Sequence, residues 1–248
     1  MEAEKIVLPN GNTVSLATTH TLTPVNDAQI KLVPVPSPVI KVVVFLIDGA
    51  GDKKRFLGSG PNYNIQPAKP YLEKSSFSNI KPERQKDFDA QYLGYYEIFG
   101  NDNIEKNVIA AIPNKRTVIY IVGHSLGGWN GAHLSKILSD RGYDVRILVT
   151  LDPVGESPTL EFSSNIYSNT PAPIAKKWIN VVAHPSSSNF TDFVAWMGEK
   201  WKITAGPDIN TRVDTNHAEA ITLLTAKLNN GDSAYKIITQ SIYEVLSK

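Results

Sequence analysis

The sequence predicts a single α/β domain over residues 1–248, with a mostly parallel central sheet and helices on both faces. Short apolar runs rich in branched residues recur at 41–47, 117–122, 144–151 and 178–183. Continuous runs of this length are typical of strands covered on both faces, as in parallel sheets. Segments with helical spacing separate them. Strands that alternate with helices form parallel sheets through right-handed crossovers.

The N-terminal part of the chain, residues 1–38, is expected to supply short edge strands. A hairpin is predicted over 5–17 around the turn Pro9-Asn10-Gly11-Asn12. Residues 29–35 are a candidate for a further short strand, which the surrounding prolines would confine to a sheet edge.

Two irregular stretches, 53–86 and 154–177, are long enough to act as lid or cap loops over a site. The first is expected to hold a helix near 70–77. The other predicted elements are a strand over 91–99, helices over 103–112, 126–138 and 190–201, a last short strand over 201–204, and closing helices over 216–228 and 233–246.

Composition excludes several classes of function. The net charge is +1 without basic blocks, which argues against nucleic-acid binding. No apolar run approaches the ~20 residues of a membrane span. Cysteine is absent, which excludes a thiolate nucleophile and zinc–thiolate sites. The N-terminus lacks the apolar region of a secretory signal, so the expected location is cytoplasmic, with signal-less secretion left open.

The most informative motif is Gly123-His124-Ser125-Leu126-Gly127-Gly128, which stands between the apolar run 117–122 and the helical segment 126–138. A strand, Gly-x-Ser-x-Gly and a helix in this order are typical of a nucleophile elbow. Side chains at the flanking glycines would clash in so tight a turn. We therefore expect the Ser125 hydroxyl to be held out at the end of the sheet.

A serine hydroxyl becomes a useful nucleophile when a histidine, oriented by a buried carboxylate, takes its proton. Asp152 directly follows the strand 144–151, which would place its carboxylate at the same sheet edge as Ser125. Otherwise, Asp152 is a turn former before Pro153. His217 lies between the last strand region and a helix. His184, at a strand end, is the alternative base.

Over roughly residues 40–230, the chain resembles lipases and esterases of the α/β-hydrolase superfamily. The motifs that carry this resemblance are the elbow, Asp48-Gly49 and Leu151-Asp152-Pro153. The resemblance implies an α/β-hydrolase fold and a triad in the chain order Ser, Asp or Glu, His. It makes Ser125 the nucleophile and His217 the base.

The same resemblance assigns the remaining parts of the site. The main-chain N–H of Leu126 becomes one oxyanion donor, and the loop after strand 41–47 supplies the second, from Ala50 or alternatively Gly49. Some lipases use the position of Asp152 for the acid. Most family members place the acid one strand later, where Asp192 is the candidate.

The predicted function is hydrolysis of carboxylic esters, with lipid esters favoured and transient contact with a membrane surface. An apolar stripe over 190–201 either packs on the sheet or forms a lid or acyl-chain wall. The alternatives are a short-chain esterase or thioesterase, and a non-catalytic binding module on the same scaffold. No His, Asp or Glu group has metal-ligand spacing, so neither a catalytic metal nor a cofactor is expected, and a structural calcium bound by scattered carboxylates is left open.

Overall fold

A computed structural model describes residues 5–7, 13–15, 40–55, 58, 60–158, 160 and 164–247. The chain divides into two compact units, Met1–Pro38 and Val39–Lys248. The first holds an antiparallel pair, β1 (Lys5–Val7) and β2 (Thr13–Ser15), so the predicted hairpin is confirmed. The strand expected over 29–35 lies outside the described residues.

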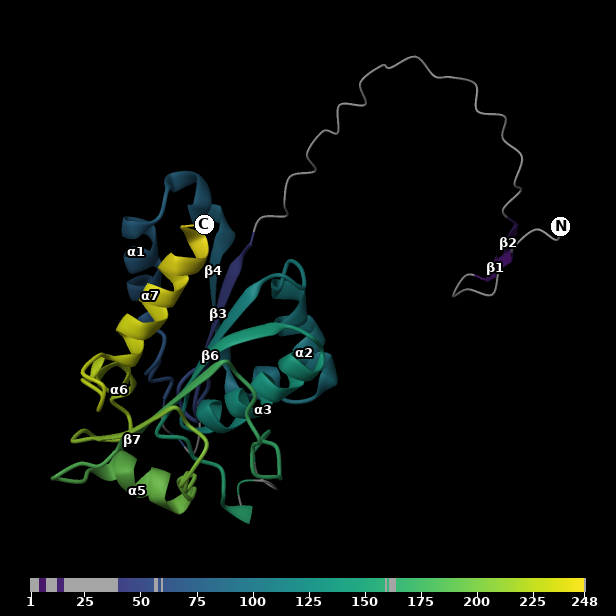
Figure 1. The fold of residues 1–248 in the computed structure, drawn as a ribbon. Helices are drawn as coiled ribbons and strands as arrows, with labels where there is room; N and C mark the ends of the chain where they lie inside the picture. The colour runs from purple at the N-terminus through teal and green to yellow at the C-terminus, as the bar shows by residue number, and fades with distance from the viewer. Residues whose placement is uncertain are drawn as a thin grey trace. The chain divides into compact units, whose positions relative to one another are not determined.

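The second unit is built on a six-stranded sheet in the order β4-β3-β5-β6-β7-β8, with every neighbouring pair parallel (Figure 1). The predicted fold class is therefore confirmed. All six strands run the same way, so the residues that follow them gather at one edge of the sheet. The strands are β3 (Val42–Asp48), β4 (Phe88–Gly94), β5 (Val118–His124), β6 (Asp144–Leu151), β7 (Lys177–Ala183) and β8 (Ile209–Val213).

Helices cover both faces of this sheet, because alternate residues of each inner strand point to opposite faces. In β5, Tyr120 belongs to one apolar cluster and Ile121 to the other. The first cluster includes residues of α1 (Ala68–Asn79), α6 (Ala220–Thr225) and α7 (Ala234–Leu246). The second includes residues of α2 (Asn101–Asn107), α3 (Leu126–Asp140) and α5 (Phe190–Met197).

The helix expected near 70–77 is present as α1, within the stretch 53–86 that was a candidate lid. Its Leu72 is fully buried in the apolar cluster, so α1 is part of the helical layer of the fold. A 3₁₀ turn, Pro82–Asp87, leads from α1 into β4. Within the described parts of the chain, no helix is long and apolar enough to cross a membrane.

The prediction of a strand over 91–99 is wrong for the second half of that range. β4 ends at Gly94, and Tyr95–Ile98 form a 3₁₀ turn. The aromatic residues continue the apolar pattern beyond the strand, which explains the prediction. The Glu97 carboxylate closes the turn by accepting the Gly94 N–H at 2.7 Å and binding Lys53 at 2.5 Å.

The prediction of a last strand over 201–204 is also wrong. The last strand of the sheet is β8, residues 209–213. Trp201 is buried because its ring stacks on Trp178, with centroids 5.4 Å apart, and not because it lies in a sheet. β8 lies at the edge of the sheet and exposes the polar residues Asn210 and Arg212. It therefore lacks the apolar run of an inner strand.

Three predicted helices are shorter than expected. The helix expected over 190–201 ends at Met197, the last residue of α5. The segment 103–112 forms α2 and then a separate 3₁₀ turn, Ile109–Ala111. The segment 216–228 is helical only over α6. Residues 216–219 consequently form part of a loop between β8 and α6, and this loop carries His217.

The sheet core can be tested at β5. We expect Ile121→Ala to lower the free energy of unfolding by about 2–5 kcal/mol, because it removes a fully buried side chain and leaves a cavity. Urea unfolding followed by circular dichroism measures the change. Lys74→Ala, at an exposed position of α1, is the matched control and should change stability by less than ~0.5 kcal/mol. Equal effects of the two changes would contradict the packing described.

Candidate active site

The predicted strand–turn–helix is present at Ser125. β5 ends at His124, α3 begins at Leu126, and Ser125 has φ 55° and ψ −124°. A Cβ on Gly123 would lie 2.2 Å from the carbonyl oxygen of Gly127, so the turn tolerates no side chain there. The Ser125 N–H donates to the carbonyl of Leu151 at 3.0 Å, which ties the turn to the end of β6.

The structure brings Ser125, His217 and Asp152 into one hydrogen-bonded chain. His217 Nε2 lies 3.0 Å from Ser125 Oγ, and His217 Nδ1 lies 2.6 Å from Asp152 Oδ2. The other Asp152 oxygen accepts the main-chain N–H of Ala183 at 3.0 Å. The three residues follow β5, β8 and β6 respectively, at one edge of the sheet, and all three are buried. With Nδ1 protonated, Nε2 is free to accept the serine proton.

The charges around this chain favour an ionised acid and a neutral base. Burial alone would raise the pKa of Asp152, but hydrogen bonds and charges from His217 and Lys200 hold it below its ordinary value. Burial lowers the pKa of His217, and the positive charges of His124 and Lys200 act in the same direction. His217 is therefore neutral at neutral pH, as a general base must be.

Lys200 was not singled out from the sequence. Its Nζ lies 2.8 Å from Asp152 Oδ2, the same oxygen that binds His217. Lys200 follows the aromatic helix α5 in a segment without a recognisable motif, and only the fold brings it to the acid. No signal in the sequence could have found it.

The alternative acid and base lie elsewhere in the site. One oxygen of Asp192 accepts the main-chain N–H of His217 at 2.8 Å, and the other accepts from Asn216 and Asn189. Asp192 thus holds the loop that carries His217, while Asp152 contacts the imidazole. His184 is exposed at the end of β7, and its N–H donates to Val213.

The loop after β3 passes directly against Ser125, the candidate nucleophile. A Cβ on Gly49 would lie 2.6 Å from the Cβ of Ser125. The Gly49 N–H donates to Asp52 Oδ2 at 3.0 Å, which commits this donor and leaves Ala50 as the candidate second oxyanion donor. Leu126 is the first residue of α3, where main-chain N–H groups have no partner within the helix.

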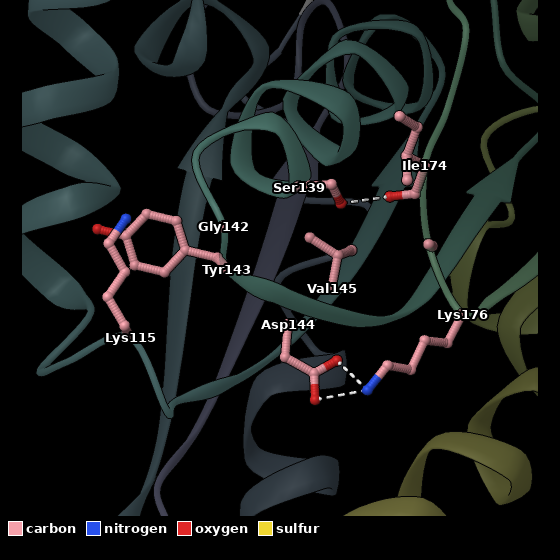
Figure 2. A pocket seen from close by; sticks show the side chains of 9 residues that line it. Lys115, Ser139, Gly142, Tyr143, Asp144, Val145, Ile174 and Lys176 are labelled. Carbon is pink, nitrogen blue, oxygen red and sulfur yellow. Dashed lines mark hydrogen bonds and ion pairs between the residues drawn. The ribbon is translucent and has the colours of Figure 1, made fainter.

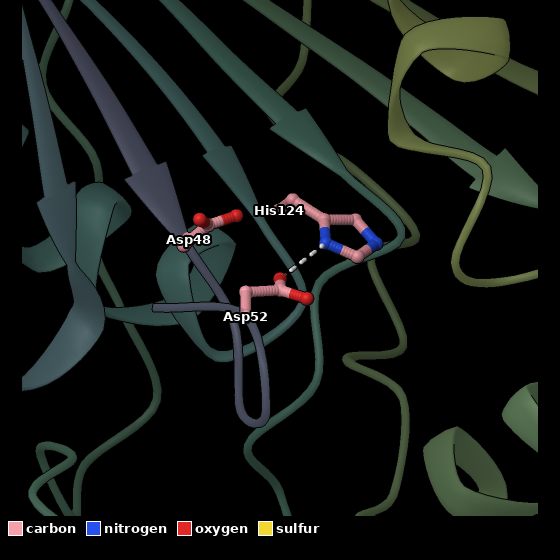
Figure 3. Close-up of side chains that lie close together, drawn as sticks. All are labelled: Asp48, Asp52 and His124. Atoms are coloured by element: carbon pink, nitrogen blue, oxygen red, sulfur yellow. Dashed lines mark ion pairs between the residues drawn. The ribbon is translucent and has the colours of Figure 1, made fainter. Parts of the chain in front are cut away.

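Asp48 and Asp52, which lie on either side of Gly49 and Ala50 in the chain, form a buried cluster with His124 (Figure 3). Asp48 accepts from the Ile65 N–H at 3.3 Å and from the Tyr92 hydroxyl. His124 Nδ1 faces Asp52 at 3.5 Å, and its Nε2 lies 2.7 Å from the main-chain oxygen of His217. The cluster therefore connects the loop after β3 with the loop that carries His217.

The three side chains have donor atoms within 4.8 Å of one another, a proximity that their spacing in the sequence does not indicate. Burial and the charge of Asp52 raise the pKa of Asp48 to about 9, so Asp48 is neutral. Burial would lower the pKa of His124, but Asp52 raises it above its ordinary value. Despite burial, the pKa of Asp52 is held below its ordinary value by hydrogen bonds and the charge of His124, so Asp52 stays ionised between neutral Asp48 and protonated His124. Because the carboxylate oxygens are already hydrogen-bonded, we assign no metal to these residues.

Two surface hollows lie at opposite ends of the sheet. The hollow in Figure 2 surrounds Asp144, at the amino end of β6, where Asp144 binds Lys176. Asp152 follows the carboxyl end of β6, roughly 25 Å away along the strand. A second hollow, of about 240 Å³, is lined by residues of the loop after β3 and of two other segments: Gly49, Gly51, Lys54, Arg55, Tyr95, Tyr96, Ser164 and Asn165.

The sheet, the elbow and the order of the three residues give this chain an α/β-hydrolase fold. No protein-family model and no curated protein sequence matches the chain. Among solved structures, it is similar to YbtT, a type II thioesterase from the yersiniabactin NRPS/PKS biosynthetic pathway. The identity is 12%, the coverage 84% of this chain and 95% of the other, and the TM-score 0.41.

The chain is also similar to two esterases. A hyperthermophilic esterase from the archaeon Pyrobaculum calidifontis has 12% identity, coverage of 85% of this chain and 78% of the other, and a TM-score of 0.33. Carboxyl esterase 2 from the fungus Tuber melanosporum has 13% identity, coverage of 99% and 87%, and a TM-score of 0.36. These values are too low to transfer a substrate, so the function must be argued from the site itself.

The two candidate acids can be separated by paired substitutions. Asp152→Asn should lower kcat for an ester substrate by roughly 10⁴-fold, because the amide cannot hold His217 in the required tautomer. Asp192→Asn keeps an acceptor for the His217 N–H and should cost less than about tenfold. Steady-state kinetics at saturating substrate measure both. A larger loss for Asp192→Asn would assign the acid to that residue.

Proposed function

We propose that this protein is a serine hydrolase of carboxylic esters that works through an acyl-enzyme on Ser125. The observation that carries the proposal is the hydrogen-bonded chain from Ser125 through His217 to Asp152, located at a nucleophile elbow. This arrangement activates a hydroxyl for attack on an acyl carbon.

The reaction follows from the positions of these groups. His217 Nε2 takes the proton of Ser125 as Oγ attacks the ester carbonyl carbon. The resulting oxyanion accepts hydrogen bonds from the main-chain N–H groups of Leu126 and Ala50. His217 then protonates the leaving alcohol as the bond to the acyl carbon breaks. Water repeats the sequence on the acyl-enzyme, with His217 as its base, and releases the acid.

The substrate class we propose is lipid esters. The hollow beside Gly49 is smaller than the ~300–1,000 Å³ of typical ligand pockets and is mixed in polarity, so we place a long acyl chain outside it. α5 exposes Phe190, Phe193, Trp196 and Met197, with Phe190 at 71% and Trp196 at 69% exposure. Exposed apolar patches of this kind mark lipid or partner surfaces. Asp192 in the first turn of α5 binds the His217 loop, which places this surface next to the site.

A fluorophosphonate probe tests the reaction class without knowledge of the substrate. Wild-type protein should be labelled covalently at Ser125, and Ser125→Ala should remain unlabelled; mass spectrometry of the intact protein and its peptides measures both. A folded wild-type protein that resists the probe would favour the alternative of a non-catalytic binding module.

The lipid assignment is tested by changing α5. Phe190→Ser combined with Trp196→Ser should reduce hydrolysis of long-chain p-nitrophenyl esters and of phospholipid vesicles by about tenfold or more, because less apolar surface meets the substrate. Activity on p-nitrophenyl acetate should be retained. Tyr71→Ser, at an exposed position of α1, is the matched control.

Other results would change the substrate class. Wild-type activity confined to acetyl or butyryl esters would exclude lipid substrates. A preference for acyl thioesters over oxygen esters of the same acyl chain would assign the site to a thioesterase.

A further inference from the structure

The catalytic acid proposed above carries a second basic partner that the triad mechanism does not require. Asp152 is 1% exposed, and its Oδ2 contacts both His217 Nδ1 at 2.6 Å and Lys200 Nζ at 2.8 Å. Lys200 also donates to the carbonyl of Ala183 at 3.2 Å, and its side chain is 28% exposed. A partly exposed lysine therefore brings a positive charge to a buried carboxylate.

The backbone around Lys200 is held firmly against the segment that follows the acid. Lys200 pairs with Val154 in an antiparallel bridge, and the Trp201 N–H donates to the carbonyl of Pro153 at 2.8 Å. The N–H groups of Gly155 and Glu156 both donate to the carbonyl of Glu199. Trp201 is buried between Trp178 and Trp129. Lys200 is thus directed at Asp152 by its surroundings, unlike a mobile surface lysine.

The charge balance explains what this contact does. A buried carboxylate needs a compensating cation or strong donors. In most triads the histidine is the cationic partner once it becomes protonated, whereas here a lysine already compensates Asp152 while His217 is neutral. An extra positive charge behind Asp152 also opposes protonation of His217, because imidazolium and ammonium would share one carboxylate oxygen.

We propose that Lys200 is a positioning residue of the site, which keeps Asp152 ionised and His217 neutral and so extends the activity of the base to lower pH. The inference rests on the proposed hydrolase function. Five charged or titratable groups surround His217. Asp152 and Lys200 lie on its Nδ1 side, and Asp192 accepts its main-chain N–H. The His124 ring lies with its centroid 4.9 Å from that of His217, and Asp52 contacts His124.

The sign of the effect follows from which form reacts. Only neutral His217 accepts the serine proton, so activity is present above its pKa and is lost as the pH falls through that pKa. Removing the ammonium stabilises imidazolium, which raises the pKa of His217. The acidic limb of the pH profile must then move to higher pH.

The test is the pH dependence of the fluorophosphonate labelling rate, and of kcat/KM on a p-nitrophenyl ester, in four proteins. Lys200→Met should move the acidic limb up by about one pH unit. Lys200→Arg keeps the charge and should leave the limb close to that of the wild type. Lys202→Met, at an exposed position two residues away, removes the same charge from the same segment without touching Asp152. This control should match the wild type. KM should change little in Lys200→Met, since Lys200 does not contact the substrate in the proposed site.

Two outcomes would overturn the inference. In the first, folded Lys200→Met has the acidic limb of the wild type; in the second, its rate falls equally at all pH values, as expected of a residue that only holds the loop. If Lys200→Met does not fold, Lys200→Gln, which retains a donor for the Ala183 carbonyl, replaces it.

An NMR titration of the His217 ring in Ser125→Ala and Ser125→Ala/Lys200→Met tests the same shift without any activity. Failure of the wild type to react with the probe would refute the proposed hydrolase. An unchanged His217 titration would refute only the role of Lys200.

Discussion

The close contact of three backbones at the elbow is the constraint on which the site depends. A Cβ on Gly127 would lie 2.3 Å from the carbonyl oxygen of Ile47, and one on Gly123 would lie 2.2 Å from that of Gly127. β3, β5 and α3 therefore touch main chain to main chain, which only glycine permits. The contact holds Ser125 at positive φ and brings the loop after β3 against the nucleophile. A parallel sheet then delivers the other groups to the same edge, because the carboxyl ends of its strands coincide.

Two buried carboxylate–histidine pairs lie side by side at that edge and carry opposite charge states. The rings of His124 and His217 have centroids 4.9 Å apart. Asp52 has no lysine among its contacts in the described residues, so it draws a proton onto His124, whose pKa is raised above its ordinary value despite burial. Burial lowers the pKa of His217, and the charges of His124 and of Lys200, which binds Asp152, act in the same direction, so His217 is neutral. The different surroundings of Asp52 and Asp152 thus accompany opposite charge states in two adjacent histidines.

The sequence was most informative where local pattern and burial coincide. Inner strands such as β6 are continuous apolar runs, and the elbow requires its glycines, so the fold class followed from the residues. The resemblance to α/β-hydrolases supplied the order of the candidates Ser125, Asp152 and His217, with Asp192 as the alternative acid. β8 was missed because an edge strand with one buried face lacks that run. Lys200 and the cluster of Asp48, Asp52 and His124 could not be predicted, since contacts between distant residues arise from the packing of loops. The catalytic roles of the site residues remain predictions that the geometry supports.

α5 and the segment that follows it connect the exposed apolar surface to both partners of the proposed base. Asp192, in the first turn of α5, fixes the main chain of His217, and Lys200, three residues after its last turn, binds the carboxylate that orients the imidazole. The first turn of α5 is therefore attached to the loop that carries His217, and the segment after its last turn is attached to Asp152. A binding surface joined in this way cannot shift as a rigid unit without altering the distance from Asp152 to Lys200 or the position of the His217 loop.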